Sequence, residues 1–169
     1  SPNGIAFDDS GNLYIADSNN NRIQKWAPGA TEGTTVAGGN GYGSSADQLS
    51  SPNGIAFDDS GNLYIADSNN NRIQKWALGA TEGKTVAGGN GKGSSADQLG
   101  SPNGIAFDDS GNLYIADSNN NRIQKWAPGA TEGTTVAGGN GYGSSADQLS
   151  SPNGIAFDDS GNLYIADSN

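Results

Sequence analysis

A period of 50 residues runs through the whole chain, which has 169 residues. Residues 1–50 and 101–150 are identical, and residues 151–169 repeat the start of the unit. The second unit, 51–100, departs from the first at four positions: Leu78, Lys84, Lys92 and Gly100. Nearly identical units of this length are expected to adopt one small fold each and to stack on one another, because a single unit is too small to bury its own core.

One unit contains four short segments that favour β-structure and are separated by turn residues. Aromatic and β-branched residues are common in these segments, and Ser10 and Gly11 between the first two are typical of a tight hairpin turn. A Gly-rich crossing segment follows the fourth strand, and one helical turn is predicted in it at 44–49. The unit is therefore predicted to be a four-stranded antiparallel sheet. The predicted strands are 4–9, 12–18, 22–27 and 34–38.

The alternation of side chains predicts that both faces of this sheet are buried. Ile5 and Phe7 point to one face, and Gly4 and Ala6 point to the other, so neither face is polar. A sheet of this kind needs a neighbour on each side, and four-stranded units of about 40–50 residues arranged around an axis form a β-propeller. The fold class is therefore predicted to be all-β. The predicted blades are 1–50, 51–100 and 101–150, with the first two strands of a fourth at 151–169.

Three motifs occur together in each unit: Asp-x-x-Gly-Asn at 8–12, Tyr-x-Ala-Asp at 14–17 and Asn-x-Arg-Ile at 20–23. This combination closely resembles the NHL repeat, which is a propeller blade. The resemblance implies a ring that commonly has six blades, and an interaction platform more often than catalysis. Three blades and a half cannot close a ring, so the blades are predicted to be completed by more chain or by other copies.

The composition excludes several classes of site. The chain has no histidine and no cysteine, which excludes a Ser-His-Asp triad, a thiolate nucleophile, a disulfide and the usual zinc ligand sets. Its 18 acidic and 8 basic residues give a net charge of −10 without a basic cluster, so nucleic acid is not an expected partner. The apolar runs are only a few residues long, and insertion into a membrane is not expected.

Three acidic residues of the unit are candidate metal ligands. Asp8, Asp9 and Asp17 lie in or next to Asx-rich turns, and carboxylate and amide oxygens suit Ca²⁺. The same side chains can instead cap the turns, and the spacing does not fit an EF-hand loop, because Leu13 stands where its glycine would be. No cofactor is therefore expected, with Ca²⁺ as the alternative.

Other side chains of the unit are candidates for structural roles. Arg22 is expected to pair with Asp17 or with the next blade, and recognition of an anion is the alternative. Trp26 is expected to pack between blades, where an indole ring buries a large apolar area; stacking on a sugar is the alternative. The structural candidates, including the turn glycine, are Arg22, Trp26, Trp76, Trp126 and Gly11.

The near-identity of the units favours a structural function. An active site needs unlike residues that converge on one point, whereas identical blades offer only symmetric rings. The chain is therefore predicted to be a non-catalytic, self-assembling scaffold and not an enzyme, with another copy of itself as its partner. The first alternative is a module that binds carbohydrate or protein, with Tyr42 and Tyr142 as exposed contacts in Gly-rich loops. The second alternative is a metal-dependent, lactonase-like enzyme.

Two further expectations concern the setting of the chain. The acidic surface and the absence of cysteine chemistry favour an extracellular or cell-surface location. The lack of an initiator Met and the stop at Asn169, inside a unit, indicate a processed product, a fragment or an excerpt of a longer array.

Overall fold

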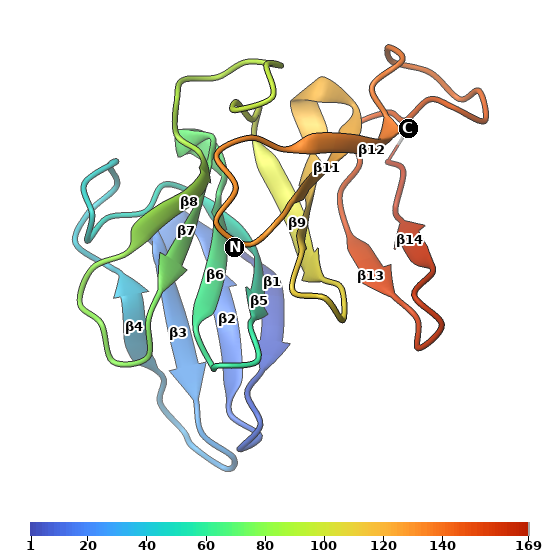
Figure 1. Ribbon diagram of the computed structural model, residues 1–169. Helices are drawn as coiled ribbons and strands as arrows, with labels where there is room; N and C mark the ends of the chain where they lie inside the picture. The colour runs from blue at the N-terminus through green and yellow to red at the C-terminus, as the bar shows by residue number, and fades with distance from the viewer. Residues whose placement is uncertain (169) are drawn as a thin grey trace.

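The computed structural model describes residues 1–168 and confirms the predicted all-β fold class (Figure 1). Asn169, the last residue of the predicted half blade, lies outside the described residues. The chain forms three four-stranded antiparallel sheets, or blades, and one two-stranded sheet, each with its strands in chain order. The first blade contains β1 (Pro2–Phe7), β2 (Leu13–Asp17), β3 (Arg22–Trp26) and β4 (Thr34–Gly38).

The second and third blades repeat this arrangement, and the last two strands form a shorter hairpin, here called the half blade. The second blade contains β5 (Pro52–Phe57), β6 (Leu63–Asp67), β7 (Arg72–Trp76) and β8 (Lys84–Gly88). The third contains β9 (Pro102–Phe107), β10 (Leu113–Asp117), β11 (Arg122–Trp126) and β12 (Thr134–Gly138). The half blade contains β13 (Ile155–Phe157) and β14 (Leu163–Ile165).

Helical structure in residues 1–168 is confined to three short 3-10 turns, each between the second and third strand of a blade: η1 (Ser18–Asn20), η2 (Ser68–Asn70) and η3 (Ser118–Asn120). The helical turn predicted at 44–49 is not formed, because this segment consists of bends and turns and is held by an isolated parallel bridge between Tyr42 and Leu49. None of the described helical segments is long and apolar enough to cross a membrane.

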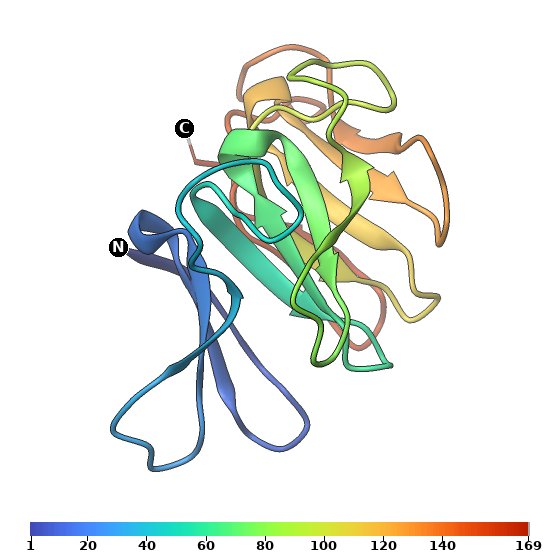
Figure 2. The same cartoon turned by 90° about the vertical axis from the view of Figure 1, so that its left-hand side faces the viewer.

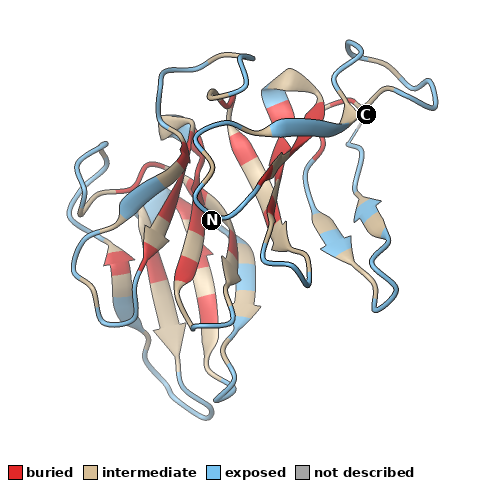
Figure 3. Cartoon of the chain, viewed as in Figure 1, coloured by how far each residue is buried: buried red, intermediate tan, exposed pale blue. Residues whose placement is uncertain are grey.

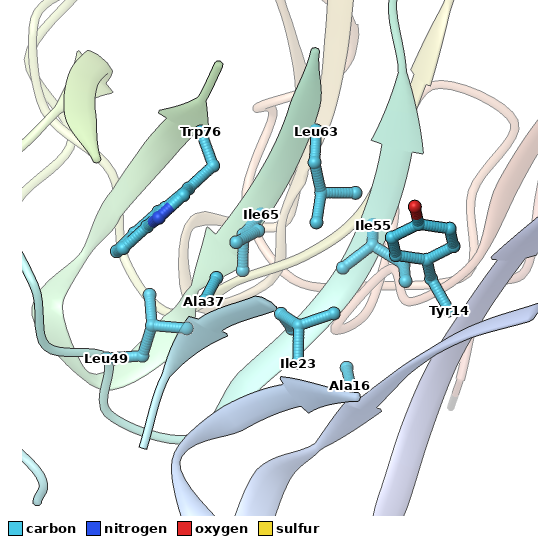
Figure 4. Close-up of a cluster of buried hydrophobic side chains, with 9 residues drawn as sticks. All are labelled: Tyr14, Ala16, Ile23, Ala37, Leu49, Ile55, Leu63, Ile65 and Trp76. Atoms are coloured by element: carbon cyan, nitrogen blue, oxygen red, sulfur yellow. The ribbon is translucent and has the colours of Figure 1, made fainter. Parts of the chain in front are cut away.

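The blades pack face to face and share cores between them. The first core combines side chains of blade 1, blade 2 and the crossing segment that joins them, among them Ile23, Leu49 and Ile65, all fully buried (Figure 4). An edge-to-face aromatic pair, Tyr14 with Phe57, closes it at a centroid distance of 4.8 Å. The same pair recurs at the next two junctions, so each blade covers its successor in the same way.

The two ends of the array do not meet the expectation that both faces of every sheet are covered. On blade 1, the apolar side chains of Ile5 and Phe7 are exposed, whereas Ile55 and Ile105, the equivalents of Ile5, are buried. Figure 3 shows the contrast: the buried positions concentrate in the second and third blades, while β1 and the half blade are largely exposed. In the view of Figure 2, blade 1 stands at one side of the stack.

Candidate functional site

The innermost strand of each blade begins with a β-bulge. In β5 the pairing with β6 passes from Pro52↔Asp67 to Ile55↔Ile65, which leaves one extra residue at Asn53–Gly54. The same shift occurs in β1 and β9. A bulge redirects the side chains next to it and is frequent beside functional sites. The asparagine at the bulge is therefore a candidate functional residue.

The glycine after each bulge asparagine allows neighbouring inner strands to approach backbone to backbone. A Cβ on Gly4 would clash with the carbonyl oxygen of Asn53, and one on Gly54 would clash with that of Asn103. Between β9 and the half blade, the N–H of Gly104 donates to the carbonyl of Asn153 at 2.8 Å. The asparagines of successive blades therefore lie next to one another along the inner ends of the strands.

The side-chain amides of Asn53, Asn103 and Asn153 have no hydrogen-bond partner among residues 1–168, whereas the amide of Asn3 donates to Ser18 Oγ at 3.1 Å. We call these three residues the amide row. Each amide offers two N–H donors and one acceptor oxygen, so the row can bind a polar ligand. Sequence reasoning did not select these residues, although the recurring Pro-Asn-Gly before an apolar run was a usable signal for a bulge.

A buried ion pair supports the polar end of each inner blade. Arg72 Nε donates to Asp67 Oδ2 at 2.7 Å, and the other oxygen of Asp67 accepts the N–H of Ser50 at 2.7 Å. The guanidinium also donates to backbone carbonyls of the preceding crossing segment, at Ser44, Ser45 and Gln48. Burial raises the pKa of Asp67, although hydrogen bonds from Asn70, Ser50 and Arg72 oppose this effect. These hydrogen bonds connect blade 2 to the crossing segment that follows blade 1.

The equivalent pair in blade 1 shows where the structure places Asp17 and Arg22. Arg22 Nε lies 2.9 Å from Asp17 Oδ2, but both side chains are partly exposed. Asp17 also accepts a hydrogen bond from Asn20 at 2.8 Å. Asp17 and Arg22 therefore form an ion pair on their own blade, which is one of the two arrangements considered for Arg22 from the sequence.

The carboxylates considered as metal ligands do not converge. Asp8 caps its own turn: its Oδ1 accepts the backbone N–H groups of Ser10 at 3.0 Å and Asn12 at 2.9 Å, and its Oδ2 accepts a bond from the Asn12 side-chain amide at 2.8 Å. These bonds lower the pKa of Asp8, and the bond from the Asn12 side chain has the largest effect. Asp9 is exposed, and Asp17 is the last residue of β2, at the end of the strand away from the turn that contains Asp8. Within residues 1–168 no group of three or more acidic side chains is suitably placed for a metal ion, so Asp8, Asp9 and Asp17 do not form a joint site.

The remaining residues singled out from the sequence lie apart from the amide row. Tyr42 and Tyr142 are 79% and 67% exposed in the crossing segments. Trp76 and Trp126 are buried between blades, whereas Trp26 is only half-buried. Gly11 has a φ of +79° in its hairpin turn, a conformation that glycine adopts without strain.

A groove of about 1020 Å³ runs between blades 2 and 3, at the ends of the strands opposite the bulges. Its walls include Tyr64, Phe107 and Trp126. Its charged groups include Lys75 and Asp58, and Lys75 Nζ lies 3.7 Å from Asp58 Oδ2. Burial raises the pKa of Tyr64. The groove has aromatic walls and charged groups, but its lining residues come from blades 2 and 3 only. The amide row has residues from these two blades and from the half blade.

The sequence profile of the family described as SMP-30/gluconolactonase/LRE-like region matches residues 1–137, and the NHL repeat profile matches residues 149–169. The predicted resemblance to NHL propellers is therefore confirmed. The chain has no match among curated protein sequences.

Several solved structures share the fold. A chain of the nidogen/laminin complex is 27% identical to this chain, with a TM-score of 0.75. The alignment covers 99% of this chain and 57% of the nidogen/laminin chain. The gluconolactonase XC5397 of Xanthomonas campestris is 16% identical with a TM-score of 0.75, covering 99% and 54%. Virginiamycin B lyase of Staphylococcus aureus, in a catalytically inactive form with quinupristin, is 20% identical with a TM-score of 0.66, covering 98% and 48%. The chain thus spans about half the length of these proteins.

These matches correct two expectations drawn from the sequence. The interpretation as a non-catalytic scaffold is wrong, and so is the statement that the chain is not an enzyme, because the matching family over residues 1–137 is an enzyme family. The error came from the argument that identical blades cannot build an active site.

Proposed function

The chain belongs to the SMP-30/gluconolactonase/LRE-like family, and from that membership we propose that it forms part of a propeller enzyme that hydrolyses cyclic esters. The family match over residues 1–137 carries the proposal. The amide row of Asn53, Asn103 and Asn153 is the site that we assign to the substrate, because their backbones adjoin the neighbouring inner strands and their side-chain amides have no partner among residues 1–168.

Opening a cyclic ester requires water to add to the carbonyl carbon, which places negative charge on the carbonyl oxygen. The ring C–O bond then breaks, and the departing oxygen takes up a proton. Side-chain amide N–H groups are suitable donors to such an oxyanion, and one donor typically contributes about 10²–10³ to the rate. The amide oxygens of the row can at the same time accept hydrogen bonds from substrate hydroxyl groups.

The described residues supply binding, orientation and stabilisation of the oxyanion. The carboxylates nearest this end of the inner blades, Asp67 and Asp117, are held by Arg72 and Arg122 at 2.7 Å and act in the framework. A metal ion held by three carboxylates does not fit residues 1–168, so no step of the reaction is assigned to one.

The test is to measure the hydrolysis of a panel of lactones in a pH-stat, which records the proton released by each carboxylic acid formed. A δ-lactone of a sugar acid and unsubstituted γ- and δ-lactones separate recognition of hydroxyl groups from recognition of the ester. The double variant Asn53→Ala/Asn103→Ala is expected to lower kcat/KM by about 10²-fold or more. Asn53→Asp retains the size of the side chain and removes its amide donors, so it should also lower the rate.

The matched control is Tyr42→Ala/Tyr142→Ala, which removes two exposed side chains that lie outside the amide row. This control should leave lactone hydrolysis unchanged. If no lactone is hydrolysed faster than in buffer, the chain does not have the proposed activity. If hydrolysis occurs and the asparagine variants do not change it, the reaction stands and the amide row is not its site.

The exposure of Tyr42 and Tyr142 favours a second candidate function, the binding of a glycan or a protein ligand through the crossing segments. Exposed tyrosine rings can stack on apolar faces of a ligand while their hydroxyl groups form hydrogen bonds. A glycan array with the unchanged chain and the double tyrosine variant tests this function. Hits that persist in the variant would exclude these residues as the contacts.

A further inference from the structure

The groove between blades 2 and 3 contains a pair of lysines that blades 1 and 3 do not have at the equivalent positions. Lys75 of β7 is the direct cross-strand partner of Lys84 of β8, and both residues line the groove. In blades 1 and 3 the residue opposite the equivalent lysine is a threonine, Thr34 or Thr134. The second unit therefore departs from the other two at a position that changes the charge of this groove.

The two ammonium groups of this pair are not equally satisfied within the chain. Residues directly opposite each other on antiparallel strands project to the same face of the sheet, and like charges at such positions are destabilising. Lys75 Nζ lies 3.7 Å from Asp58 Oδ2 and 5.5 Å from the centre of the Tyr64 ring. Lys84 is exposed and forms no ion pair within residues 1–168. An anionic group of a ligand, placed between the two lysines, would stabilise this arrangement.

A further donor in the wall of the groove also has no partner. Trp126 is only 3% exposed, and its Nε1 atom has no hydrogen-bond partner in the described part of the chain. Unpaired buried N–H groups are uncommon in folded proteins, and each one calls for an explanation. Because Trp126 lines the groove, an oxygen atom of a ligand bound there is a candidate acceptor for its indole N–H.

The other groups of the groove restrict the chemistry of this ligand. The carboxylates of Asp59, Glu82 and Asp108 also line the groove, and they repel an anion that carries several charges. The same carboxylates accept hydrogen bonds from hydroxyl groups. The aromatic walls, with Phe107 and Trp126, suit the apolar face of a ring. A ligand with a single carboxylate on a hydroxylated ring matches all of these groups.

We propose that the groove between blades 2 and 3 binds a sugar acid, a sugar ring that carries one carboxylate. The carboxylate lies between the ammonium groups of Lys75 and Lys84, where charge-assisted hydrogen bonds are stronger than neutral ones. The ring hydroxyl groups donate to Asp59 and Glu82, and the ring lies against the aromatic wall. The volume of about 1020 Å³ is sufficient for a small ligand of this kind. The groove is at the strand ends opposite the amide row, so the two sites are separate.

Isothermal titration calorimetry of the full chain with galacturonate tests the site, with galactose and acetate as comparison ligands. Galacturonate should bind more tightly than either, because it alone combines the carboxylate with the hydroxylated ring. Lys84→Thr restores the residue of the other two units, so the blade should fold, and binding should weaken by about tenfold or more. Lys92→Tyr is the matched control. It also restores the residue of the other units and removes one positive charge, but it lies in the crossing segment and should leave the affinity unchanged.

The repeat also allows a test by gain of binding. Thr34→Lys places a lysine directly opposite Lys25 in blade 1. This variant should gain a second galacturonate site between blades 1 and 2, where Trp76 also has an Nε1 atom without a partner in the described part of the chain. A variant that gains no site would show that the lysine pair does not bind the carboxylate, and the proposal would be overturned.

Three further results would overturn the proposal: no saturable binding of galacturonate, equal affinity for galacturonate and galactose, or binding that Lys84→Thr does not weaken. The double variant Asn53→Ala/Asn103→Ala should leave the affinity for galacturonate unchanged. If it abolishes binding, the ligand occupies the amide row and not the groove. All of these measurements are made without a lactone, so this proposal and the proposed hydrolysis fail separately.

Discussion

Blade 1 and blade 3 consist of the same fifty residues in the same order, but their environments differ. Blade 3 lies between blade 2 and the half blade, whereas blade 1 has a neighbour on one side only. Arg122 and Asp117 are buried, while the side chains of Arg22 and Asp17 are 35% and 15% exposed. Because the sequence of the two blades is the same, the difference shows that the burial of a residue depends on its neighbours in the array.

The largest expected difference is at the arginines. Arg122→Ala leaves the buried Asp117 carboxylate without its partner and removes hydrogen bonds to the crossing segment, so unfolding free energy should fall by about 3–5 kcal/mol. Arg22→Ala removes a partly exposed pair and should cost about 1 kcal/mol or less. Urea denaturation of the two variants measures both losses. Equal losses would mean that burial does not set the strength of this pair.

Ile105 and Ile5 provide the next comparison. Ile105→Ala removes a buried side chain from the core between blades 2 and 3 and should lower stability by about 2–4 kcal/mol. Ile5→Ala changes a mostly exposed side chain and should lie within about 0.5 kcal/mol of the unchanged chain. Thermal denaturation of the two variants compares the losses. A large loss from Ile5→Ala under these conditions would show that its face is covered in solution.

A smaller effect is expected at the bulge glycines. A Cβ on Gly104 would clash with the carbonyl of Asn153, and relief of this overpacking should cost about 1–3 kcal/mol. At Gly154 the nearest atom to such a Cβ is Ala166 Cβ at 3.9 Å, so Gly154→Ala should be nearly neutral. Chemical denaturation of the two alanine variants provides the measurement. If Gly154→Ala is as harmful as Gly104→Ala, another strand must lie against β13.

The smallest expected effect is the titration of equivalent aspartates in blades 1 and 2. The pKa of Asp17 is lowered, because hydrogen bonds from Asn20 and Arg22 outweigh the opposing effect of partial desolvation. The pKa of Asp67 is raised, because this side chain is buried. Asp17 should therefore add stability above the unfolded pKa of about 4, and this is lost as the pH falls through its lowered pKa. Asp67 should reduce stability as the pH rises from about 4 through its raised pKa.

Carbon-detected NMR titration of the two carboxyl groups checks these directions. Shifts of the same sign would contradict the assigned role of burial.

The strand pattern of one unit was predictable because it depends on local properties. Alternating apolar residues, the Ser10–Gly11 turn and the Asx-rich turn after Asp17 specify a meander almost residue by residue. The first strand begins at Pro2, two residues earlier than predicted, since the bulge at Asn3 lets the pairing continue past it. The helical turn predicted at 44–49 was wrong, because this segment forms bends and turns that the bridge between Tyr42 and Leu49 closes into a loop.

The candidate site was not predictable in the same way. The amide row is assembled from asparagines fifty residues apart, and only the packing of glycines against neighbouring backbones brings them together. The sequence made Asp8, Asp9 and Asp17 candidate ligands, but Asp8 and Asp9 lie in the turn before β2 and Asp17 lies at the opposite end of that strand. The roles of Tyr42 and Tyr142, binding of Ca²⁺ and an extracellular location remain predictions.

The repeat by itself determined that this chain folds into blades of antiparallel strands and that each blade needs neighbours, because hydrogen-bonding pattern and apolar faces are written within fifty residues. Only the tertiary structure decided which copies of those residues are buried, which arginines find carbonyls and which asparagines stay free. The physical reason is that burial and pairing across blades depend on position in the array, which identical units of sequence cannot specify.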